Sequence, residues 1–310
     1  MGDFQHFVPR FYLKGFLDPA SLGKNKLEPY LWVVDIEKKT VKSRAPKNIA
    51  GFSRYYDVST EPFNNDQKMI DNLLTVFETR VVPIIRNIRN NQFQTTIEER
   101  YDLATFIGVQ IGRVPIFRQH ISDNFDNVPN AWLQDFMRDE KKLKQKLGKN
   151  AEKFKELVRS GKIKLRPKFK SEEHEKDFML SVSINLGIDF AKLVFGMRWV
   201  FLLTTTDTKF IASDNPVALL SPGAKPLKIK FGELNEEIEI YLPISSECAM
   251  LMHSHDVVQK PNIGSNEIVQ VGNDTVEKTN WGILPTIDKY AYCSSEEQAK
   301  WVLNHVDTAS

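Results

Sequence analysis

The chain has 310 residues and a formal net charge of +2, so no global electrostatic field draws it to nucleic acid or to a membrane. Its 41% hydrophobic and 26% charged residues are typical of a folded globular protein, and this length can bury a substantial core. The two cysteines, Cys248 and Cys293, form no CxxC pair, which predicts a reducing compartment with both thiols packed as small apolar groups.

Membrane and export signals are not evident in the sequence. The N-terminal residues lack a charged segment followed by a long apolar run, which argues against a signal peptide. The most apolar stretch, WVFLLTTT from Trp199, is too short to cross a bilayer. We therefore expect a soluble, cytoplasmic protein that has no membrane partner.

The first hundred residues change from strand-like to helical periodicity. Residues 27–46 alternate as in a β-hairpin with EKKT at the turn, and residues 47–58 form a further extended piece that ends in aromatic residues. Apolar residues then recur at helical spacing, and Pro83 is expected to kink or interrupt this helix. A second helix is expected to begin at a capping box formed by Thr96 and Glu99.

The stretch from residue 125 to 170 is the most charged part of the chain, with Lys and Arg far outnumbering Asp and Glu. Its pattern predicts two short helices with a turn at Gly148 and a stop at Gly161. The favoured interpretation is a solvated helical excursion. The alternative is a basic face that contacts phosphate backbones, a sequence-independent attraction that salt weakens. Few aromatic residues interleave with the lysines, so we do not expect a base-stacking platform.

The second half of the chain opens with an amphipathic helix over residues 171–197 and continues as short β-branched or aromatic runs divided by Gly, Pro and Asp. A short helix at 273–283, a last strand at 289–294 and a capped terminal helix follow. The order of strands, helices and strands predicts an α+β fold. We expect a single domain over residues 1–310, with a central helical region, a charged helical excursion at about 125–170, and a mainly antiparallel sheet built from the N-terminal segment and the C-terminal half.

The run Ser213-Asp214-Asn215-Pro216 is the sharpest local signal for a site. Three side chains that can hydrogen-bond the backbone precede a residue that fixes φ, which is good turn chemistry. The run also places a carboxylate and an amide at the end of an apolar strand, where scaffolds present catalytic groups. Both interpretations, a turn and a site, remain open at this point.

Gln110 and Arg113 lie near the end of a helix whose other positions are mostly apolar, and their spacing of three places them on one face. Buried polar groups need partners. The guanidinium of Arg113 is therefore expected either to pair with a carboxylate or to receive an anion.

Three further patterns carry less weight. Arg113 and His120 match the loose Arg-x(4 to 6)-His spacing of metal-independent helical ribonucleases, but Pro115 breaks the helix that would align them. His253 and His255 could share a strand face, but without a third ligand we favour a surface strand end over a metal site. No P-loop, GxGxxG, GxSxG or HExxH motif occurs, which argues against nucleotide-cofactor and α/β-hydrolase chemistry.

Four stretches follow one another in a familiar order: QHFVPRFYLKGF, NIAGFSRYYDV, IGVQIGRVP and WVFLLTTTDTKFIASDNPV. With them, nearly the whole chain resembles a bacterial family catalogued as domain of unknown function 4238. Its members open with QHxVPxxYL, carry a mid-chain helix with Gln and Arg before Pro, and share a Thr-Ser-Asp-Asn-Pro-type turn. Here Ala212 stands before the Ser-Asp-Asn-Pro run in place of an expected Ser or Thr. The resemblance supplies no activity. It implies that the opening segment belongs to the core and that the recurring motifs include His6, Gln110, Arg113, Asp214 and Asn215.

The leading functional hypothesis is a hydrolase of phosphodiesters, metal-independent or weakly metal-dependent, that acts as a nuclease-like toxin or phage-defence effector. His6 would serve as the general acid or base, and Asp214 would orient it. Asn215 would donate a hydrogen bond to a developing oxyanion. Arg113 and Arg10 would hold the phosphate or its transition state.

The remaining substrate-binding candidates are Gln110 on the central helix and Lys142, Lys144 and Lys146 in the charged region, where residues 138–170 would hold a nucleic-acid partner. The alternative is a ligand- or partner-binding protein without catalysis, whose buried polar motifs form a structural network. A third hypothesis is a divalent-metal site formed by Asp214, His6 and a carboxylate that the sequence does not identify, which a metal-dependent thermal shift would test. Cofactor and oligomeric state are left undetermined.

Overall fold

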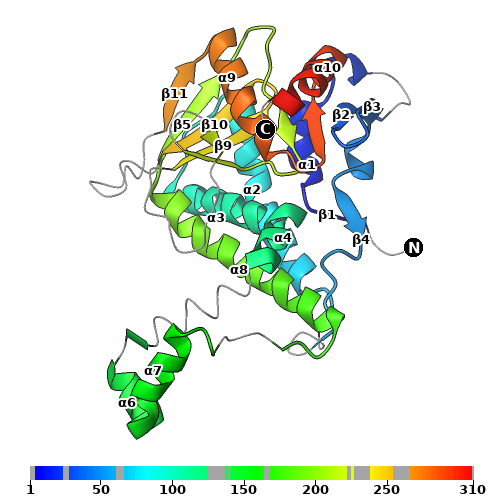
Figure 1. Ribbon diagram of the computed structural model, residues 1–310. Coiled ribbons are helices and arrows are strands. Elements are labelled where there is room, and N and C mark those ends of the chain that lie inside the picture. The colour runs from blue at the N-terminus through cyan, green and yellow to red at the C-terminus, as the bar shows by residue number, and fades with distance from the viewer. Residues whose placement is uncertain are drawn as a thin grey trace.

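The computed structural model arranges the chain in three layers, with β-sheets between two sets of helices (Figure 1). Helices α9 (Asn273–Ile283) and α10 (Glu296–His305) cover one side of the sheets. Helices α2 (Met69–Arg89), α3 (Ile97–Arg113) and α8 (Glu172–Gly196) lie on the other side. This is the α+β fold that the sequence predicts. The structure describes residues 4–23, 28–60, 66–124, 137–138, 140–163, 168–221, 225–226, 238–253 and 266–308.

The described strands form three sheets. The largest has the order β11-β5-β10-β9-β7-β8 and is antiparallel except where β11 runs parallel to β5. The second has the order β3-β2-β12-β6, and the third pairs β1 with β4. The bounds are β1 Phe4–His6, β2 Leu31–Asp35, β3 Thr40–Arg44, β4 Gly51–Ser53, β5 Arg198–Leu203, β6 Ala212–Ser213, β7 Ala218–Ser221, β8 Lys225–Pro226, β9 Glu239–Ser245, β10 Cys248–His253, β11 Glu267–Gln270 and β12 Tyr290–Cys293.

Mainly antiparallel pairing between the N-terminal segment and the C-terminal half is confirmed in the second sheet. There the predicted hairpin β2–β3 meets the last strand, with Val34 opposite Ala291 in an antiparallel register. Two parts of the chain that are far apart in sequence thus share one sheet.

Side-chain alternation divides the core between the two sides of the sheets. On β5, Trp199 and Phe201 join the core that contains α3, whereas Val200 and Leu202 join the core that contains α9. This period of two is what a strand buried on both faces requires, because successive side chains point to opposite faces.

Helices α3 and α8 cross with their backbones in close approach. A Cβ atom added at Gly108 would lie 2.2 Å from the carbonyl oxygen of Gly187, and one added at Gly112 would lie 2.2 Å from that of Ser183. Helix α8 is long and apolar enough to cross a membrane by length and composition alone. In this structure it packs along α3 instead, with Leu180 and Ile184 in the main core.

Helix boundaries follow local chemistry with one exception. The capping box at α3 is formed: Glu99 N–H donates to the Thr96 hydroxyl at 3.1 Å, and Thr96 N–H donates to the Glu99 carboxylate at 2.9 Å. Pro83 does not interrupt its helix, because α2 continues through it to Arg89. The ring of Pro83 is exposed, while buried apolar residues on both sides hold the helix against the core.

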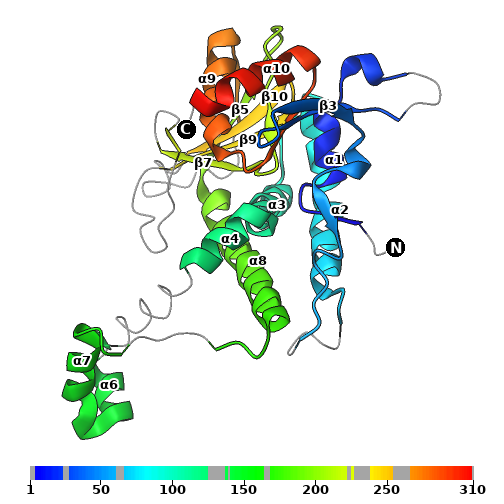
Figure 2. The same cartoon turned by 45° about the vertical axis from the view of Figure 1, so that its right-hand side comes forward.

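The predicted charged excursion contains two short helices, α6 (Glu140–Leu147) and α7 (Ala151–Arg159), and Figure 2 shows them standing away from the sheets and from α8. The expected turn and stop are confirmed, since Gly148 and Gly161 have φ of +51° and +69°. The short helices α1 (Arg10–Leu13) and α4 (Pro115–Asn124) complete the described α-helices.

Candidate functional site

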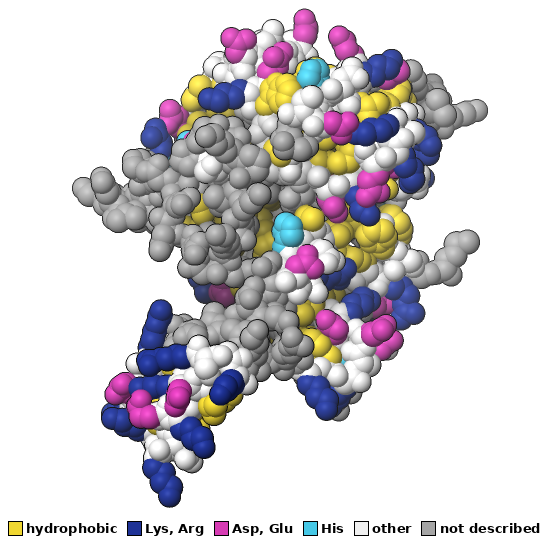
Figure 3. All heavy atoms as spheres, in the orientation of Figure 1, with side chains coloured by type: hydrophobic (Ala, Val, Ile, Leu, Met, Phe, Trp, Pro, Cys, Tyr) yellow, Lys and Arg dark blue, Asp and Glu magenta, His cyan; other side chains and the backbone are white. Residues whose placement is uncertain are grey.

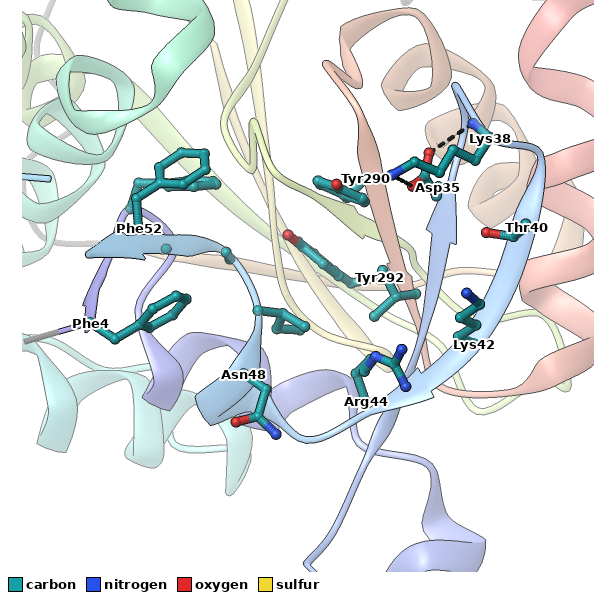
Figure 4. Close-up of a pocket in the computed structure, with 15 residues that line it drawn as sticks. Phe4, Asp35, Lys38, Thr40, Lys42, Arg44, Asn48, Phe52, Tyr290 and Tyr292 are labelled. Carbon is teal, nitrogen blue, oxygen red and sulfur yellow. Dashed lines mark hydrogen bonds and ion pairs between the residues drawn. The ribbon is translucent and has the colours of Figure 1, made fainter. Parts of the chain in front are cut away.

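A cavity of about 360 Å³ lies between the second sheet and the small β1–β4 sheet (Figure 4). One side of it is the face of β3, β2 and β12 that points away from α10, and the opposite side is formed by β1, β4 and the turn that leads into β4. This size is within the range of small-molecule sites. The lining residues are Phe4, Phe7, Val33, Asp35, Lys38, Thr40, Lys42, Arg44, Asn48, Ile49, Ala50, Gly51, Phe52, Tyr290 and Tyr292.

Strand register explains why these side chains meet. Val33 lies opposite both Lys42 and Tyr292, so the three side chains project from the same face of adjacent strands. Asp35 lies opposite Thr40 and Tyr290 in the same way. The alternate residues of these strands point to the other core, where Val34 and Ala291 are fully buried. One face of the second sheet therefore lines the cavity, and the other face packs into the core.

Aromatic rings form the side of the cavity opposite the sheet. Phe4 and Phe52 both line the cavity and are 45% and 52% exposed, which is unusual for such large apolar side chains. Their rings lie on opposite faces of the β1–β4 pair, because Phe4 pairs with Ser53 and Phe52 pairs with Gln5 (Figure 4). The ring of Phe7 is buried and lies 5.5 Å from that of Phe52. These rings offer an apolar surface on which a planar group can stack.

Two cations on the edge strand β3 have no carboxylate partner among the described residues. Lys42 and Arg44 are both exposed, and among the described residues the guanidinium of Arg44 donates one hydrogen bond, at 3.3 Å, to the neighbouring Ser43 carbonyl. Lys38 differs, because its ammonium lies 3.2 Å from Asp35. Burial opposes ionisation of Asp35, but hydrogen bonds from the backbone and ammonium of Lys38 hold its pKa below the ordinary value. Positive charge at this edge is therefore only partly neutralised.

Tyr292 lines the cavity with a hydroxyl group that is buried and has no hydrogen-bond partner among the described residues. Burial raises the pKa of this phenol, so it stays protonated at neutral pH. In Figure 4 its hydroxyl points from β12 toward the β1–β4 side. A buried polar group without a partner costs stability unless a ligand or water completes it.

The backbone beneath the aromatic side is held by polar residues of α3. Gln110 donates from Nε2 to the Phe7 carbonyl at 2.8 Å, and Arg113 donates from Nη2 to the His6 carbonyl at 2.6 Å. Gln5 accepts from the Tyr56 N–H at 2.6 Å and donates to Asp57 at 2.9 Å. These side chains therefore fix the strand that presents Phe4 and Phe7.

Arg113 is paired rather than available to an anion. Its Nη1 donates to Glu78 Oε1 at 2.7 Å, and its Nε donates to the Tyr56 hydroxyl at 3.2 Å. Only 3% of the residue is exposed. Burial opposes the charge, but Tyr56 and Glu78 outweigh it and raise the pKa of Arg113.

Asp214 and Asn215 support the opposite side of the cavity. The buried carboxylate of Asp214 accepts hydrogen bonds from the backbone N–H groups of Asp288, Lys289 and Tyr290 at 3.1, 2.8 and 2.9 Å. Asn215 donates from Nδ2 to the Thr286 carbonyl at 3.1 Å. This turn thus holds the segment that leads into β12, which carries Tyr290 and Tyr292.

The turn into β4 carries backbone strain at the cavity. Ala50 has a φ of +55° and is buried, and its carbonyl accepts from the N–H groups of Phe7 and Val8 at 2.8 and 3.3 Å. At Gly51 an added Cβ would lie 2.5 Å from the Gln5 carbonyl oxygen. Such conformations persist where surrounding contacts impose them, and they concentrate at functional sites.

His6 lies beside the cavity and is not among the lining residues. Its ring centroid is 5.0 Å from that of Phe4, and its Nε2 atom is buried without a hydrogen-bond partner in the described part of the chain. Burial lowers the pKa of His6, although hydrogen bonding to the backbone at Pro46 opposes this effect. The neutral imidazole therefore predominates at neutral pH.

A family model described as a protein of unknown function (DUF4238) matches residues 5–296. The chain belongs to this family. Searches of curated proteins and of solved structures gave no match.

The structure brings some of the predicted site residues together and separates others. His6, Gln110 and Arg113 meet around β1, whereas Asp214 and Asn215 bond to the segment before β12. Arg10 begins α1 and is exposed. The remaining candidates, Lys142, Lys144 and Lys146, are exposed on α6, and Lys144 lies 3.7 Å from Glu140.

The structure also places the residues of the Arg113/His120 and His253/His255 patterns. Arg113 ends α3 and His120 lies on the separate helix α4, which begins at Pro115. His255 lies outside the described residues, and His253 is 3.7 Å from Glu239. No cluster of three potential metal ligands occurs in the described part of the chain.

The cavity residues Lys42, Arg44, Phe52, Tyr290 and Tyr292 were not identified from sequence. Their signal was present in the period-two spacing of Thr40-x-Lys42-x-Arg44 and Tyr290-x-Tyr292, which places each set on one strand face. What sequence could not provide was the pairing of β2 with β12, which makes the two sets neighbours.

Proposed function

We propose that this protein binds a nucleotide, either free or at the end of a polynucleotide, in the cavity between the second sheet and the β1–β4 pair. The observation that carries the proposal is the combination of exposed aromatic rings, cations without carboxylate partners among the described residues and a buried unpaired hydroxyl around one space of about 360 Å³. Each of the three features matches a different part of a nucleotide.

The aromatic side fits a base. Phe4 and Phe52 line the cavity with large exposed rings from opposite faces of the β1–β4 pair, and the buried ring of Phe7 lies 5.5 Å from that of Phe52. Stacking on aromatic side chains stabilises a bound base by about 1–3 kcal/mol and tolerates any base, because every base has a π-face. An apolar ligand alone would use these rings equally well, but it would leave the opposite, charged edge without a partner.

The cationic edge fits a phosphate. Lys42 and Arg44 lie two residues apart on β3, so both side chains project from the cavity face. Charge-assisted hydrogen bonds from ammonium and guanidinium groups to phosphate oxygens are among the strongest in proteins, and Arg can bind two oxygens at once.

The hydroxyl of Tyr292 is the third feature of the cavity that fits a nucleotide. It remains a neutral donor and acceptor, and because it is buried, a base edge or a ribose hydroxyl reaches it only when the neighbouring lining side chains move aside. Removing it costs affinity only if the ligand is its partner, which makes Tyr292→Phe an informative substitution.

Binding without catalysis is favoured by the surroundings of the family motifs. Gln110, Arg113 and Asn215 donate hydrogen bonds to backbone carbonyls that build the two sides of the cavity. The Asp214 carboxylate accepts hydrogen bonds from backbone N–H groups on one of these sides. This is the behaviour expected of a structural network that shapes a ligand site.

A second candidate, hydrolysis of a phosphodiester held in the cavity, is supported by His6. Its buried Nε2 atom has no partner among the described residues, its imidazole is neutral, and its ring contacts Phe4, which lines the cavity. A neutral imidazole can accept a proton from water or from a ribose hydroxyl, and here this requires that the contacts burying Nε2 open toward the cavity. Activity as a toxin or phage-defence effector would follow from this second function.

The binding proposal is tested by isothermal titration of the purified protein with ATP, AMP, adenosine and inorganic phosphate. We expect AMP or ATP to bind more tightly than adenosine or phosphate alone. Lys42→Ala with Arg44→Ala should weaken binding about tenfold or more, since each charge-assisted hydrogen bond contributes roughly 1.5–3 kcal/mol. Phe52→Ala and Tyr292→Phe should also weaken it. Lys278→Ala, an exposed position on α9 that does not line the cavity, is the control.

The absence of any binding at millimolar nucleotide, or equal affinity in the Lys42/Arg44 variant, would refute the proposal. The second candidate is tested by incubating the protein with bis(p-nitrophenyl) phosphate, RNA and single-stranded DNA, with and without EDTA. His6→Ala should abolish any cleavage and any growth inhibition on expression; full activity in this variant would exclude His6 as the catalytic group.

The cytoplasm is the proposed compartment. Cys248 and Cys293 are both free thiols and both buried, as expected for a protein that folds in a reducing environment. Cell fractionation of the tagged chain tests this assignment, and recovery in a membrane or exported fraction would contradict it.

A further inference from the structure

Helices α6 and α7 form a small helical hairpin, defined by residues 140–159, with its own apolar contacts. Leu143 and Ala151 are buried, and Val158 packs with Met137 in a separate small cluster. In both Figure 1 and Figure 2 the hairpin stands apart from the sheets and from α8. It therefore contributes little to the main core, and packing against that core does not explain its charged composition.

The hairpin and its flanking described residues carry ten Lys and Arg against three Glu over residues 137–138 and 140–163. Two of the three acidic side chains are turned toward the buried Lys155, whose ammonium lies 2.9 Å from Glu140 and 3.2 Å from Glu152. These two carboxylates thus neutralise mainly the buried ammonium of Lys155, and most of the exposed Lys and Arg side chains keep their positive charge uncompensated by them. Figure 3 shows the resulting concentration of Lys and Arg over this part of the molecule.

We propose that the helical hairpin α6–α7 is a docking surface for the phosphate backbone of a polynucleotide, bound without regard to sequence. Exposed lysines lie along both helices and the turn between them, including Lys146, Lys149 and Lys153. Exposed cations attract the phosphates of a polynucleotide, and neutralising the phosphates releases counterions from the polymer.

Two features favour a nucleic-acid backbone over a lipid surface and over base readout. None of the large apolar side chains of the hairpin is exposed, so it lacks the apolar face that an interfacial membrane helix buries among lipid chains. Its single aromatic residue, Phe154, packs into the small cluster with Met137 and Val158 and cannot stack on bases.

The docking surface is independent of the nucleotide cavity, because no residue is common to the two. The experiment measures fluorescence anisotropy of labelled single-stranded and double-stranded DNA, about 20 nucleotides long, with the full-length protein between about 50 and 200 mM salt, conditions in which phosphate contacts dominate the salt dependence. The variant K146E/K149E/K153E reverses three exposed charges, and K146R/K149R/K153R preserves them as the matched control. Circular dichroism checks that both variants keep their helices.

We expect the reversed variant to bind DNA at least about tenfold more weakly, with a slope of affinity against salt that is shallower by roughly 0.9 for every phosphate that it no longer neutralises. The arginine variant should match the wild type. Equal affinity and slope in the reversed variant would overturn the proposal. So would a weakening of polymer binding only in the Lys42/Arg44 variant, which would assign the polymer to the cavity. Binding to phosphatidylserine vesicles but not to DNA would replace the polynucleotide with a lipid surface.

Discussion

Asp214 and Tyr290 are joined by two hydrogen bonds: the Asp214 N–H donates to the Tyr290 carbonyl, and the Tyr290 N–H donates to the Asp214 carboxylate, both at 2.9 Å. The first bond extends the pairing of β6 with β12 at the edge of the second sheet. The second bond gives the buried carboxylate of Asp214 a backbone donor from the same segment. Since Tyr290 lines the cavity, the position of one of its sides depends on the Asp-Asn-Pro turn. The motif is therefore a turn, as its composition predicts, and it also supports one side of the candidate site.

The ionisation of Asp214 should make stability depend on pH. Burial raises the pKa of its carboxyl to about 7, although the three backbone N–H donors favour the charged form, and Asp288 nearby adds to the increase. An aspartate in the unfolded chain has a pKa near about 3.9. Between about pH 4 and 7 the folded state therefore holds more protons than the unfolded state, so this group's stabilising contribution is complete below about pH 4 and is lost as pH rises toward about 7.

The measurement is the free energy of unfolding in urea at several pH values for the wild type and Asp214→Asn. In the wild type, the free energy of unfolding should fall by roughly 2–4 kcal/mol between about pH 4 and 7, since each unit of pKa shift corresponds to about 1.4 kcal/mol. Asp214→Asn, which has no carboxyl to ionise at this position, should lack this fall. The variant should also be less stable at every pH, because an amide cannot accept all three hydrogen bonds. Parallel pH profiles for the two proteins would show that the pKa of Asp214 is not raised.

Arg113→Ala should destabilise the protein strongly. It removes the partner of Glu78 and leaves the His6 carbonyl and Tyr56 hydroxyl without their donor, and breaking a buried ion pair costs about 3–5 kcal/mol. Arg80→Ala is the matched control, because Arg80 pairs with Asp102 at the surface and such pairs contribute about 0–1 kcal/mol. Urea unfolding of both variants measures the difference; comparable small changes would mean that Arg113 is not integral to the fold.

Gly108→Ala should disrupt the α3–α8 crossing. The new Cβ would lie 2.2 Å from the Gly187 carbonyl oxygen and 2.8 Å from the Ala191 nitrogen, so the helices must separate. Overpacking of this kind costs about 1–3 kcal/mol or more. Gly272→Ala is the control, since nothing lies within 4 Å of a Cβ there and the change should be within about 0.5 kcal/mol. A thermal shift that is equal in the two variants would refute the close crossing.

The two thiols should be unreactive in the folded protein. Burial raises the pKa of Cys248 to about 12 and raises that of Cys293 as well, so neither forms an appreciable thiolate at neutral pH. Ellman's reagent should label no thiol in the native state and two in urea. Rapid labelling of the native protein would reveal an open conformation in which β10 or β12 separates from its neighbours.

Periodicity and local chemistry by themselves determined most of the elements of this protein. The capping box at Thr96, the turn glycines Gly148 and Gly161, and the hairpin around residues 36–39 depend on contacts between near neighbours in the chain, which a sequence displays directly. The class of fold followed from the order of these elements.

Only the tertiary structure decided where the site lies. Pairing of β2 with β12 brings Val33 beside Tyr292, and the packing of α3 beneath β1 gives Arg113 its partners Glu78 and His6. Neither contact has a local signal, because each joins residues that are far apart in sequence and whose attraction depends on burial that the folded chain creates. The same burial turns motif residues such as Arg113 into supports of the cavity and leaves Lys42 exposed at its edge.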